Sequence, residues 1–261
     1  MLPLNQIKPT LAIILALVSL TNYAAPTSAQ PNRSHTNRFD NIQISFLDGT
    51  TRGRPGRRSD TGSRDGKGCP STDTPIIALM PQNHFGLTLE QYPTFWVYIP
   101  YKPDQITSAK FVLRDQNSKE IYQTSLSLVG TPGLVSFSLP PVASLEVNNQ
   151  VTDVSGYQWD LILYCGSQDF SLRGWVQRIT RPDLERQLQT ATPRERIALY
   201  AENSIWYTAL NDLAKLRISQ PQNRTLAQDW TNLLKDVGLE TLANKPIVGS
   251  IQFNSTPERR Q

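Results

Sequence analysis

Between residues 69 and 180, apolar residues come in short runs, and several of these runs alternate with polar residues at every second position. Alternation with a period of two is typical of β-strands that bury one face. We expect seven strands on this basis: Ile76–Met80, Phe95–Ile99, Ala109–Arg114, Glu120–Leu128, Leu134–Leu139, Tyr157–Cys165 and Leu172–Ile179. Turn-forming residues separate the strands, most clearly at Asp115–Ser118, and no helical pattern interrupts them. Residues 69–180 therefore predict an antiparallel, immunoglobulin-like β-sandwich.

The pattern becomes helical in residues 181–243. Thr192–Glu195 combines an N-cap threonine, a proline at the first helical position and a glutamate at the third, which together form a capping box. Apolar residues then recur at steps of three and four over 206–216 and again over 226–237, and Gly238 ends the second run. The spacing around the first run is similar to one tetratricopeptide repeat. We predict an α+β protein in which a tetratricopeptide-like hairpin and a capping helix follow the sandwich.

Residues 1–29 have the organisation of a secretory signal peptide. Lys8 precedes an apolar run over residues 11–20, and Thr27-Ser28-Ala29 offers small residues at a cleavage site. At about 1.5 Å per residue, the apolar run is roughly half as long as a bilayer core is thick, so it predicts a cleaved signal and not a membrane anchor. We expect cleavage after Ala29 and a periplasmic or extracellular protein with no transmembrane segment.

Basic residues are concentrated in residues 30–68, which contain eight Lys or Arg residues against four acidic ones. The stretch from Thr50 to Gly68 is rich in glycine and arginine and has no large apolar residue to bury, so it predicts a disordered linker. The alternative is a basic arm that makes a weak electrostatic contact with an anionic surface. For an exported protein we expect no nucleic-acid partner. Residues 244–261 are mostly polar and predict a disordered tail.

The two cysteines, Cys69 and Cys165, lie near the two ends of the predicted sandwich. Outside the cytoplasm, two cysteines in one folded region usually pair, so we predict a disulfide between them. A bridge that closes a loop of about 100 residues contributes ~4–5 kcal/mol in the chain-entropy description.

The sequence contains few of the patterns that catalysis or cofactor binding requires. The histidines, His35 and His84, lack the spacing of a zinc site, and neither a nucleophile elbow nor a glycine-rich phosphate-binding motif is present. We therefore expect no enzymatic activity, no metal and no cofactor.

Aromatic residues supply two sets of candidate binding residues. In the first set, we expect Trp96, Tyr98 and Trp159 to stack on a sugar ring next to Asp160. The alternative is that these rings are buried beneath the helices. Because glycoside hydrolysis needs two carboxylates, a single Asp160 favours sugar binding over sugar cleavage.

The second set lies on the helical hairpin. Tyr200, Trp206 and Tyr207 are too close in sequence for all three to point in one direction, so we expect at least one ring to face a groove. This groove would bind a peptide or a helix of an envelope or secreted protein. Its rim would consist of three charged residues: Arg194, Arg196 and Glu202. Packing within the core is the other use that these rings could have.

Several segments carry a resemblance to a known family. They are Gly53–Arg58, Cys69-Pro70, Leu87–Phe95, Gly130–Ser136 and Ala191–Asn203, followed by Trp206-Tyr207. From about Gly53 to Leu239, the chain resembles the domain of unknown function 928 family, which is found mainly in cyanobacteria. The resemblance implies an exported bacterial protein and supplies no catalytic residue. Our leading interpretation is an exported, non-enzymatic protein-interaction or scaffold module, and the alternative is a carbohydrate or cell-wall binding or processing protein.

Overall fold

The computed structural model describes residues 55–60, 69–152, 155–166 and 168–253. The predicted signal peptide, most of the predicted linker and the last part of the predicted tail lie outside these ranges. The helices within them are all too short or too polar to cross a membrane.

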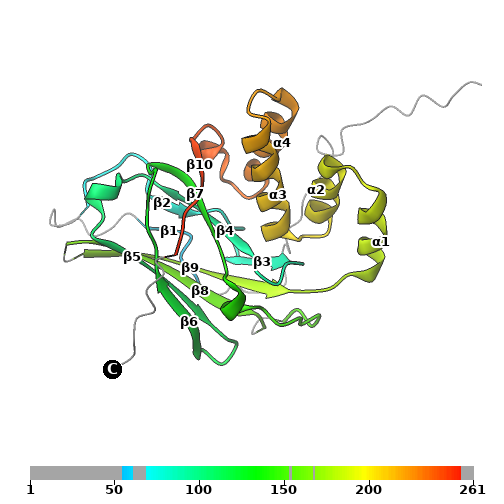
Figure 1. Ribbon diagram of the computed structural model, residues 1–261, viewed down its shortest axis with the longest axis horizontal. Helices are drawn as coiled ribbons and strands as arrows, with labels where there is room; N and C mark the ends of the chain where they lie inside the picture. Colours follow the sequence, from blue (N-terminus) through cyan, green and yellow to red (C-terminus); the bar gives the residue numbers. More distant parts are fainter. Residues whose placement is uncertain (1–54, 61–68, 153–154, 167, 254–261) are drawn as a thin grey trace, which may run out of the picture. The chain divides into compact units, whose positions relative to one another are not determined.

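The strands form two five-stranded sheets (Figure 1). The strand order is β1-β2-β4-β7-β10 in the first sheet and β3-β9-β8-β5-β6 in the second. Their bounds are β1 Ser59–Asp60, β2 Ile76–Ala78, β3 Phe85–Thr88, β4 Thr94–Ile99, β5 Ser108–Arg114, β6 Glu120–Ser125, β7 Gly133–Ser138, β8 Tyr157–Cys165, β9 Gln168–Arg178 and β10 Ile247–Ser250. All seven predicted strands are present.

Each sheet is mixed, because β10 runs parallel to β7 and β3 runs parallel to β9. The α+β class is confirmed, but the prediction of a purely antiparallel arrangement is wrong, and the immunoglobulin-like detail stays a prediction. The physical reason is the length of the connections: both parallel pairs join strands that are far apart in sequence, and only long connections allow parallel pairing.

Four α-helices follow β9, namely α1 Pro182–Thr190, α2 Pro193–Glu202, α3 Trp206–Ser219 and α4 Arg224–Asp236. The predicted capping box is confirmed at the start of α2, where the Glu195 carboxylate accepts a hydrogen bond from the Thr192 backbone N–H at 2.8 Å. Asn223 caps α4 in a similar way, and its side-chain oxygen accepts from the backbone of Thr225 at 3.0 Å. Gly238 ends the helical run with a φ of +68°. The tetratricopeptide-like character of the α2–α3 pair stays a prediction.

Aromatic side chains fill the space between the two sheets. The Phe95 ring on β4 lies 5.7 Å from Phe111 on β5 and 5.1 Å from Trp159 on β8, between ring centroids. Phe111 in turn lies 5.1 Å from Phe137 on β7. These contacts join both sheets, so the sheets pack face to face around one core, as in a sandwich.

The helical segment packs directly on this sandwich. Helix α3 contacts β3 and β4, and the helices gather beside these strands in Figure 1. Gly86 on β3 allows the close approach, because a Cβ atom there would lie 2.7 Å from the Tyr207 ring. The sandwich and the helices therefore share one hydrophobic core.

Residues 55–60 correct the prediction that 30–68 is a linker throughout. The Arg57 N–H donates to the carbonyl oxygen of Arg173 on β9 at 2.9 Å, and the Ala78 N–H on β2 donates to that of Arg58 at 2.8 Å. This segment therefore closes an edge between the two sheets with backbone hydrogen bonds, which need no apolar residues. Arg58 also donates to the Val237 carbonyl at the end of α4 at 2.7 Å, and burial lowers the pKa of Arg58 to about 10.

The predicted tail also begins within the fold. Ile247–Ser250 forms β10, where the Leu134 N–H donates to the Pro246 carbonyl at 2.7 Å. A parallel edge strand leaves little trace of alternation in four residues, so the sequence pattern did not predict it.

The predicted disulfide is confirmed. Cys69 and Cys165 are bonded, and their Cα atoms lie 5.1 Å apart, within the usual range for a bridge. The bond ties the residue that precedes β2 to the end of β8, and so links the two sheets.

Candidate functional site

The aromatic rings that we expected to line a groove on the helical hairpin are buried. Trp206 is 0% exposed, Tyr207 is 1% exposed and Tyr200 is 9% exposed. The Trp206 indole N–H donates to the Leu79 carbonyl at 2.8 Å, and the Tyr207 hydroxyl accepts from the Trp159 indole N–H at 2.9 Å. The prediction of an aromatic groove is therefore wrong. The reason is that β3 and β4 cover the face of α3 that a free hairpin would expose.

The three charged residues predicted for the rim are not brought together around an opening. Arg194 binds Asp229 on α4 through two contacts, Nε to Oδ2 at 2.6 Å and Nη2 to Oδ1 at 2.7 Å. Arg196 Nε donates to the Ala191 carbonyl at 3.1 Å and so stabilises the turn between α1 and α2. Glu202 is exposed at the end of α2. The two arginines thus stabilise the helical packing.

The predicted sugar-stacking rings are also buried, as the alternative expected. Trp96, Tyr98 and Trp159 all belong to the core. The Trp96 indole N–H donates to Asn211 Oδ1 on α3 at 3.3 Å, and the Lys245 ammonium lies 5.1 Å from the centre of the Tyr98 ring. Because no ring among the three offers a free face, the predicted stacking site is wrong.

Asp160, the carboxylate proposed to act with those rings, is buried within an ion-pair network. It lies on β8 between Arg173 on β9 and Arg114 on β5, and Arg173 Nε donates to its Oδ1 at 2.6 Å. Gln158 Nε2 donates to Oδ2 at 2.9 Å. Both carboxylate oxygens therefore have partners, which favours a structural role for Asp160.

A further charged cluster lies where the loop after β3 meets α2 and α3. Burial raises the pKa of Glu90, and the negative charge of Asp212 raises it further. Burial also raises the pKa of Asp212, whereas Lys215, at 3.8 Å, opposes that shift. The pKa of Tyr200 is raised by burial and by both carboxylates. Asn211 lowers the pKa of Glu90, but its Nδ2 makes no hydrogen bond of normal geometry. We expect this cluster to make stability depend on pH.

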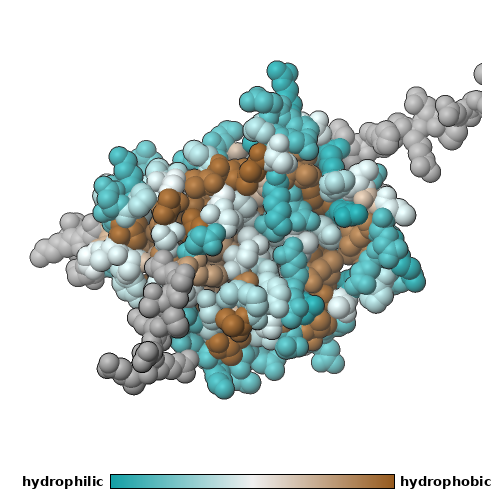
Figure 2. Space-filling model, viewed as in Figure 1, coloured by the Kyte–Doolittle hydropathy of each residue, from teal (hydrophilic) through white to brown (hydrophobic). Residues whose placement is uncertain are grey.

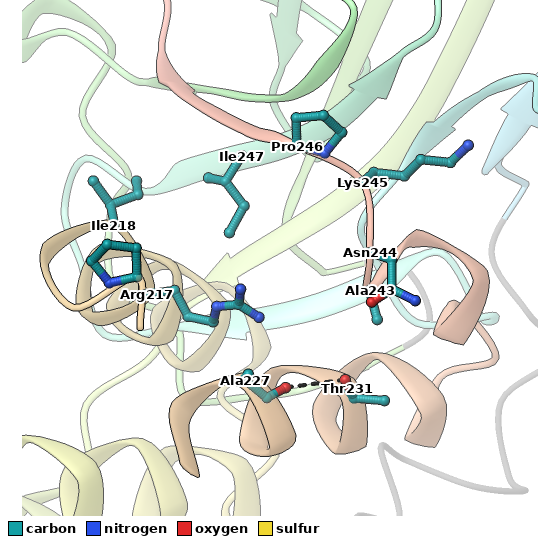
Figure 3. Close-up of a pocket in the computed structure, with 10 residues that line it drawn as sticks. Arg217, Ile218, Ala227, Thr231, Ala243, Asn244, Lys245, Pro246 and Ile247 are labelled. Carbon is teal, nitrogen blue, oxygen red and sulfur yellow. Dashed lines mark hydrogen bonds between the residues drawn. The ribbon is translucent and has the colours of Figure 1, made fainter. Parts of the chain in front are cut away.

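A cavity of about 490 Å³ opens between α3, α4 and the segment that leads into β10 (Figure 3). Its volume is within the range of small-molecule sites. Six of its ten lining residues are apolar, and none is acidic; they are Arg217, Ile218, Pro221, Ala227, Thr231, Ala243, Asn244, Lys245, Pro246 and Ile247. Figure 2 shows hydrophobic side chains over β10 and beside α4, around this part of the surface.

Arg217 is the cation of this cavity, which we call the Arg217 cavity. Figure 3 shows its side chain reaching from the last turn of α3 toward α4, with the guanidinium between Ile247 and Ala227. The side chain is half-buried, and it makes no ion pair or hydrogen bond within the described part of the chain. Burial lowers the pKa of Arg217, and no nearby acid opposes this shift. The negative end of the α3 dipole compensates only part of the charge.

The other polar side chains of the Arg217 cavity are largely engaged elsewhere. The Lys245 ammonium lies over the Tyr98 ring and donates to Thr74 Oγ1 at 3.3 Å, and Figure 3 shows it pointing away from Arg217. The Thr231 hydroxyl donates to the Ala227 carbonyl at 3.0 Å. Arg217 is therefore the charged donor that a ligand would meet in this cavity.

A second cavity, of about 390 Å³, lies beside the turn between β5 and β6. Several of its polar groups are used within the protein. Asp115 Oδ1 accepts from the backbone N–H of Asn117 and of Lys119, both at 2.9 Å. Gln177 Nε2 donates to two carbonyl oxygens, including that of Asn148 at 2.6 Å. We therefore regard the Arg217 cavity as the stronger candidate site.

Sequence reasoning missed Arg217 because no motif marks it. An arginine in the last turn of a helix is common, since it complements the helix dipole. The one local signal is that Arg217 interrupts the apolar pair Leu216 and Ile218. Its lack of a partner depends on how residues 243–247 fold around it, and residues 244–261 were predicted to be disordered.

Fold and site together define an α+β protein in which two mixed sheets and a helical segment share one core, with a basic cavity among the helices. The chain belongs to the family described as Domain of Unknown Function (DUF928), which matches residues 56–247. The match confirms the resemblance seen in the sequence. It begins within the 55–60 segment, so it includes β1, and it ends at the first residue of β10. No curated protein matches the chain.

Proposed function

We propose that this protein is an exported, non-enzymatic binding module whose ligand enters the Arg217 cavity with a negatively charged group. One observation carries the proposal: a half-buried guanidinium has no partner among the described residues, in a cavity lined by no acid. Arginine binds carboxylate and phosphate groups through two parallel hydrogen bonds, and the contact strengthens where water is partly excluded.

We thus keep the binding role that the sequence predicted, but we place the binding site in the Arg217 cavity and not in a groove on the helical hairpin. The predicted groove residues Tyr200, Trp206 and Tyr207 serve the core, whereas the Arg217 cavity is open to solvent and half-apolar. We propose that the ligand is a molecule or segment of the bacterial envelope or its surroundings. The carbohydrate alternative loses its support, because its three rings are buried and Asp160 is paired.

Export to a periplasmic or extracellular location, in a cyanobacterium, is part of the proposal. It is supported by the signal-like residues 1–29 and by the bond between Cys69 and Cys165, since disulfides persist in oxidising compartments. N-terminal sequencing of the protein from a periplasmic or culture-medium fraction should read from Gln30. Recovery of membrane-bound protein that still begins at Met1 would contradict export.

Calorimetric titration of the oxidised protein with acetate, hexanoate and phosphate tests the binding site. We expect at least one of these anions to bind, and Arg217→Gln to weaken that binding at least about tenfold, because a hydrogen bond to a charged group is worth ~1.5–3 kcal/mol. Arg224→Gln is the matched control, since Arg224 is an exposed arginine at the start of α4. No binding by any anion, or equal binding by Arg217→Gln, would contradict the site.

A further inference from the structure

The Arg217 cavity combines a single available charge with a wall that is about half apolar. Lys245, the other cation of the lining, is held by Tyr98 and Thr74. A ligand with several negative charges would leave most of them without a counter-charge here, whereas a monoanion would be fully matched by Arg217.

The apolar part of the wall extends from the guanidinium to the protein surface. Ile247 lies beside the Arg217 guanidinium in Figure 3, and Pro221, which follows α3 in the chain, also lines the cavity. Ile218 is 49% exposed at the rim. A large exposed aliphatic side chain at the rim of a cavity favours a ligand that has an apolar body of its own.

Resting on the proposed function, we infer that the ligand of the Arg217 cavity is an aliphatic monocarboxylate, an amphiphile with one carboxylate head and an unbranched hydrocarbon chain. The carboxylate accepts two hydrogen bonds from the Arg217 guanidinium, whose planar fork matches its geometry. The hydrocarbon chain lies against Ile247 and Pro221 and emerges past Ile218. Binding of this kind is a non-covalent exchange and needs no cofactor.

A chain-length series tests the inference. Acetate, butanoate, hexanoate, octanoate and decanoate are titrated into the oxidised protein by calorimetry, each below its micelle concentration. The affinity should rise by about fourfold for each methylene that the wall buries and then level off, because burying one methylene contributes ~0.8 kcal/mol. Arg217→Gln should weaken octanoate binding at least about tenfold.

Two further variants test the wall. Ile218→Ser should reduce the gain in affinity between acetate and octanoate by several fold. Ile121→Ser is the matched control, because Ile121 is a similarly exposed isoleucine on β6, 38% exposed. If Ile121→Ser changed the series as much as Ile218→Ser, the proposed place of the hydrocarbon chain would be wrong.

The head group is tested with octyltrimethylammonium, which has the same chain and the opposite charge. It should not bind detectably where octanoate does. If phosphate or acetate bound at Arg217 as tightly as octanoate, the amphiphile would be ruled out while anion binding, and hence the proposed function, stood. If octyltrimethylammonium bound as well as octanoate and Arg217→Gln had no effect, both proposals would fail. A leucine-rich peptide that bound tenfold more tightly than decanoate through its free C-terminus would overturn the inference in favour of a peptide ligand.

Discussion

Two partly buried arginines lie in the helical segment, one at the contact between α2 and α4 and one in the cavity between α3 and α4. The first is ion-paired within the protein, whereas the second has no ion pair within the described part of the chain. At the first, Arg194 binds Asp229 through two hydrogen bonds, and the Asp229 side chain is 2% exposed. At the second, Arg217 has no counter-charge among the described residues. Both arginines lie on helices of the same segment and contribute to the same region of the fold.

The difference indicates what each arginine is for. A charge that is fully paired inside the protein contributes to the stability of the fold. Removing one member of the pair leaves the other charge buried in a low-dielectric environment without a partner. A charge that is desolvated without a partner contributes little to stability and gains a partner when an anion binds. The comparison therefore predicts a large loss of stability at Arg194 and almost none at Arg217.

The largest expected effect is that of Arg194→Met. This change keeps an apolar side chain of similar length and leaves Asp229 buried without its partner. We expect the free energy of unfolding to fall by about 3–5 kcal/mol, as for other buried pairs that lose one member. Urea denaturation measures it. A loss below about 1 kcal/mol would show that Asp229 does not depend on Arg194, and would contradict the claim that this ion pair stabilises the fold.

Asp160→Asn tests the same principle on the sandwich. The variant keeps the shape of the side chain and removes the charge that Arg114 and Arg173 share. We expect a smaller loss, about 1–3 kcal/mol, because Arg173 is 47% exposed and water replaces part of the contact. The same denaturation experiment applies. If the loss matched that of Arg194→Met, exposure would not be what separates the two networks.

These two predictions use residues that the sequence alone did not pair, and the reason is general. Seven strands, β2 and β4 to β9, were predictable, as were the capping box of α2 and the stop at Gly238, because alternation, turns, capping boxes and glycine stops are local signals. The edge strands β1, β3 and β10 were not predictable, because their pairing depends on neighbours far away in sequence. The disulfide was predictable from the number of cysteines and from the export that the sequence predicts.

The candidate site was not predictable for the same reason. Tyr200, Trp206 and Tyr207 stand out in the sequence, but their use depends on whether the sandwich covers α3, and it does. Arg217 does not stand out, and its lack of a partner results from the way α4 and the β10 segment fold around it. Local sequence patterns identify side chains that are able to bind a ligand, and tertiary packing decides which of these side chains remain accessible to one.

Glu90→Gln gives a smaller effect that depends on pH. Since burial and Asp212 raise the pKa of Glu90 above its ordinary value of 4.5, the folded protein holds this proton more tightly than the unfolded chain does. The contribution of Glu90 to stability is therefore lost as the pH rises from about that value through the raised folded pKa. We expect Glu90→Gln to raise the melting temperature relative to the wild type more at pH 7 than at pH 4. Glu202→Gln, a change of an exposed glutamate on α2, is the control and should show no such trend.

The smallest effect on stability is expected at Arg217. Replacing Arg217 by Gln removes a desolvated charge and a favourable interaction with the α3 dipole, and the two changes oppose each other. We expect the free energy of unfolding to change by less than about 0.5 kcal/mol in the absence of ligand. A loss comparable to that of Arg194→Met would mean that Arg217 has a structural partner, and would contradict the comparison directly.

The most direct test follows the two arginines in one experiment. Side-chain Nε–Hε resonances of the protein are recorded by nitrogen-15 NMR, and those of Arg217 and Arg194 are assigned by their absence from Arg217→Gln and Arg194→Lys. Addition of octanoate should shift the Arg217 resonance with a saturable dependence on concentration and leave the Arg194 resonance, already held by Asp229, unchanged. An Arg217 resonance that does not move at saturating octanoate, or one that moves no more than those of exposed arginines such as Arg224, would contradict the claim that the Arg217 cavity is the ligand site.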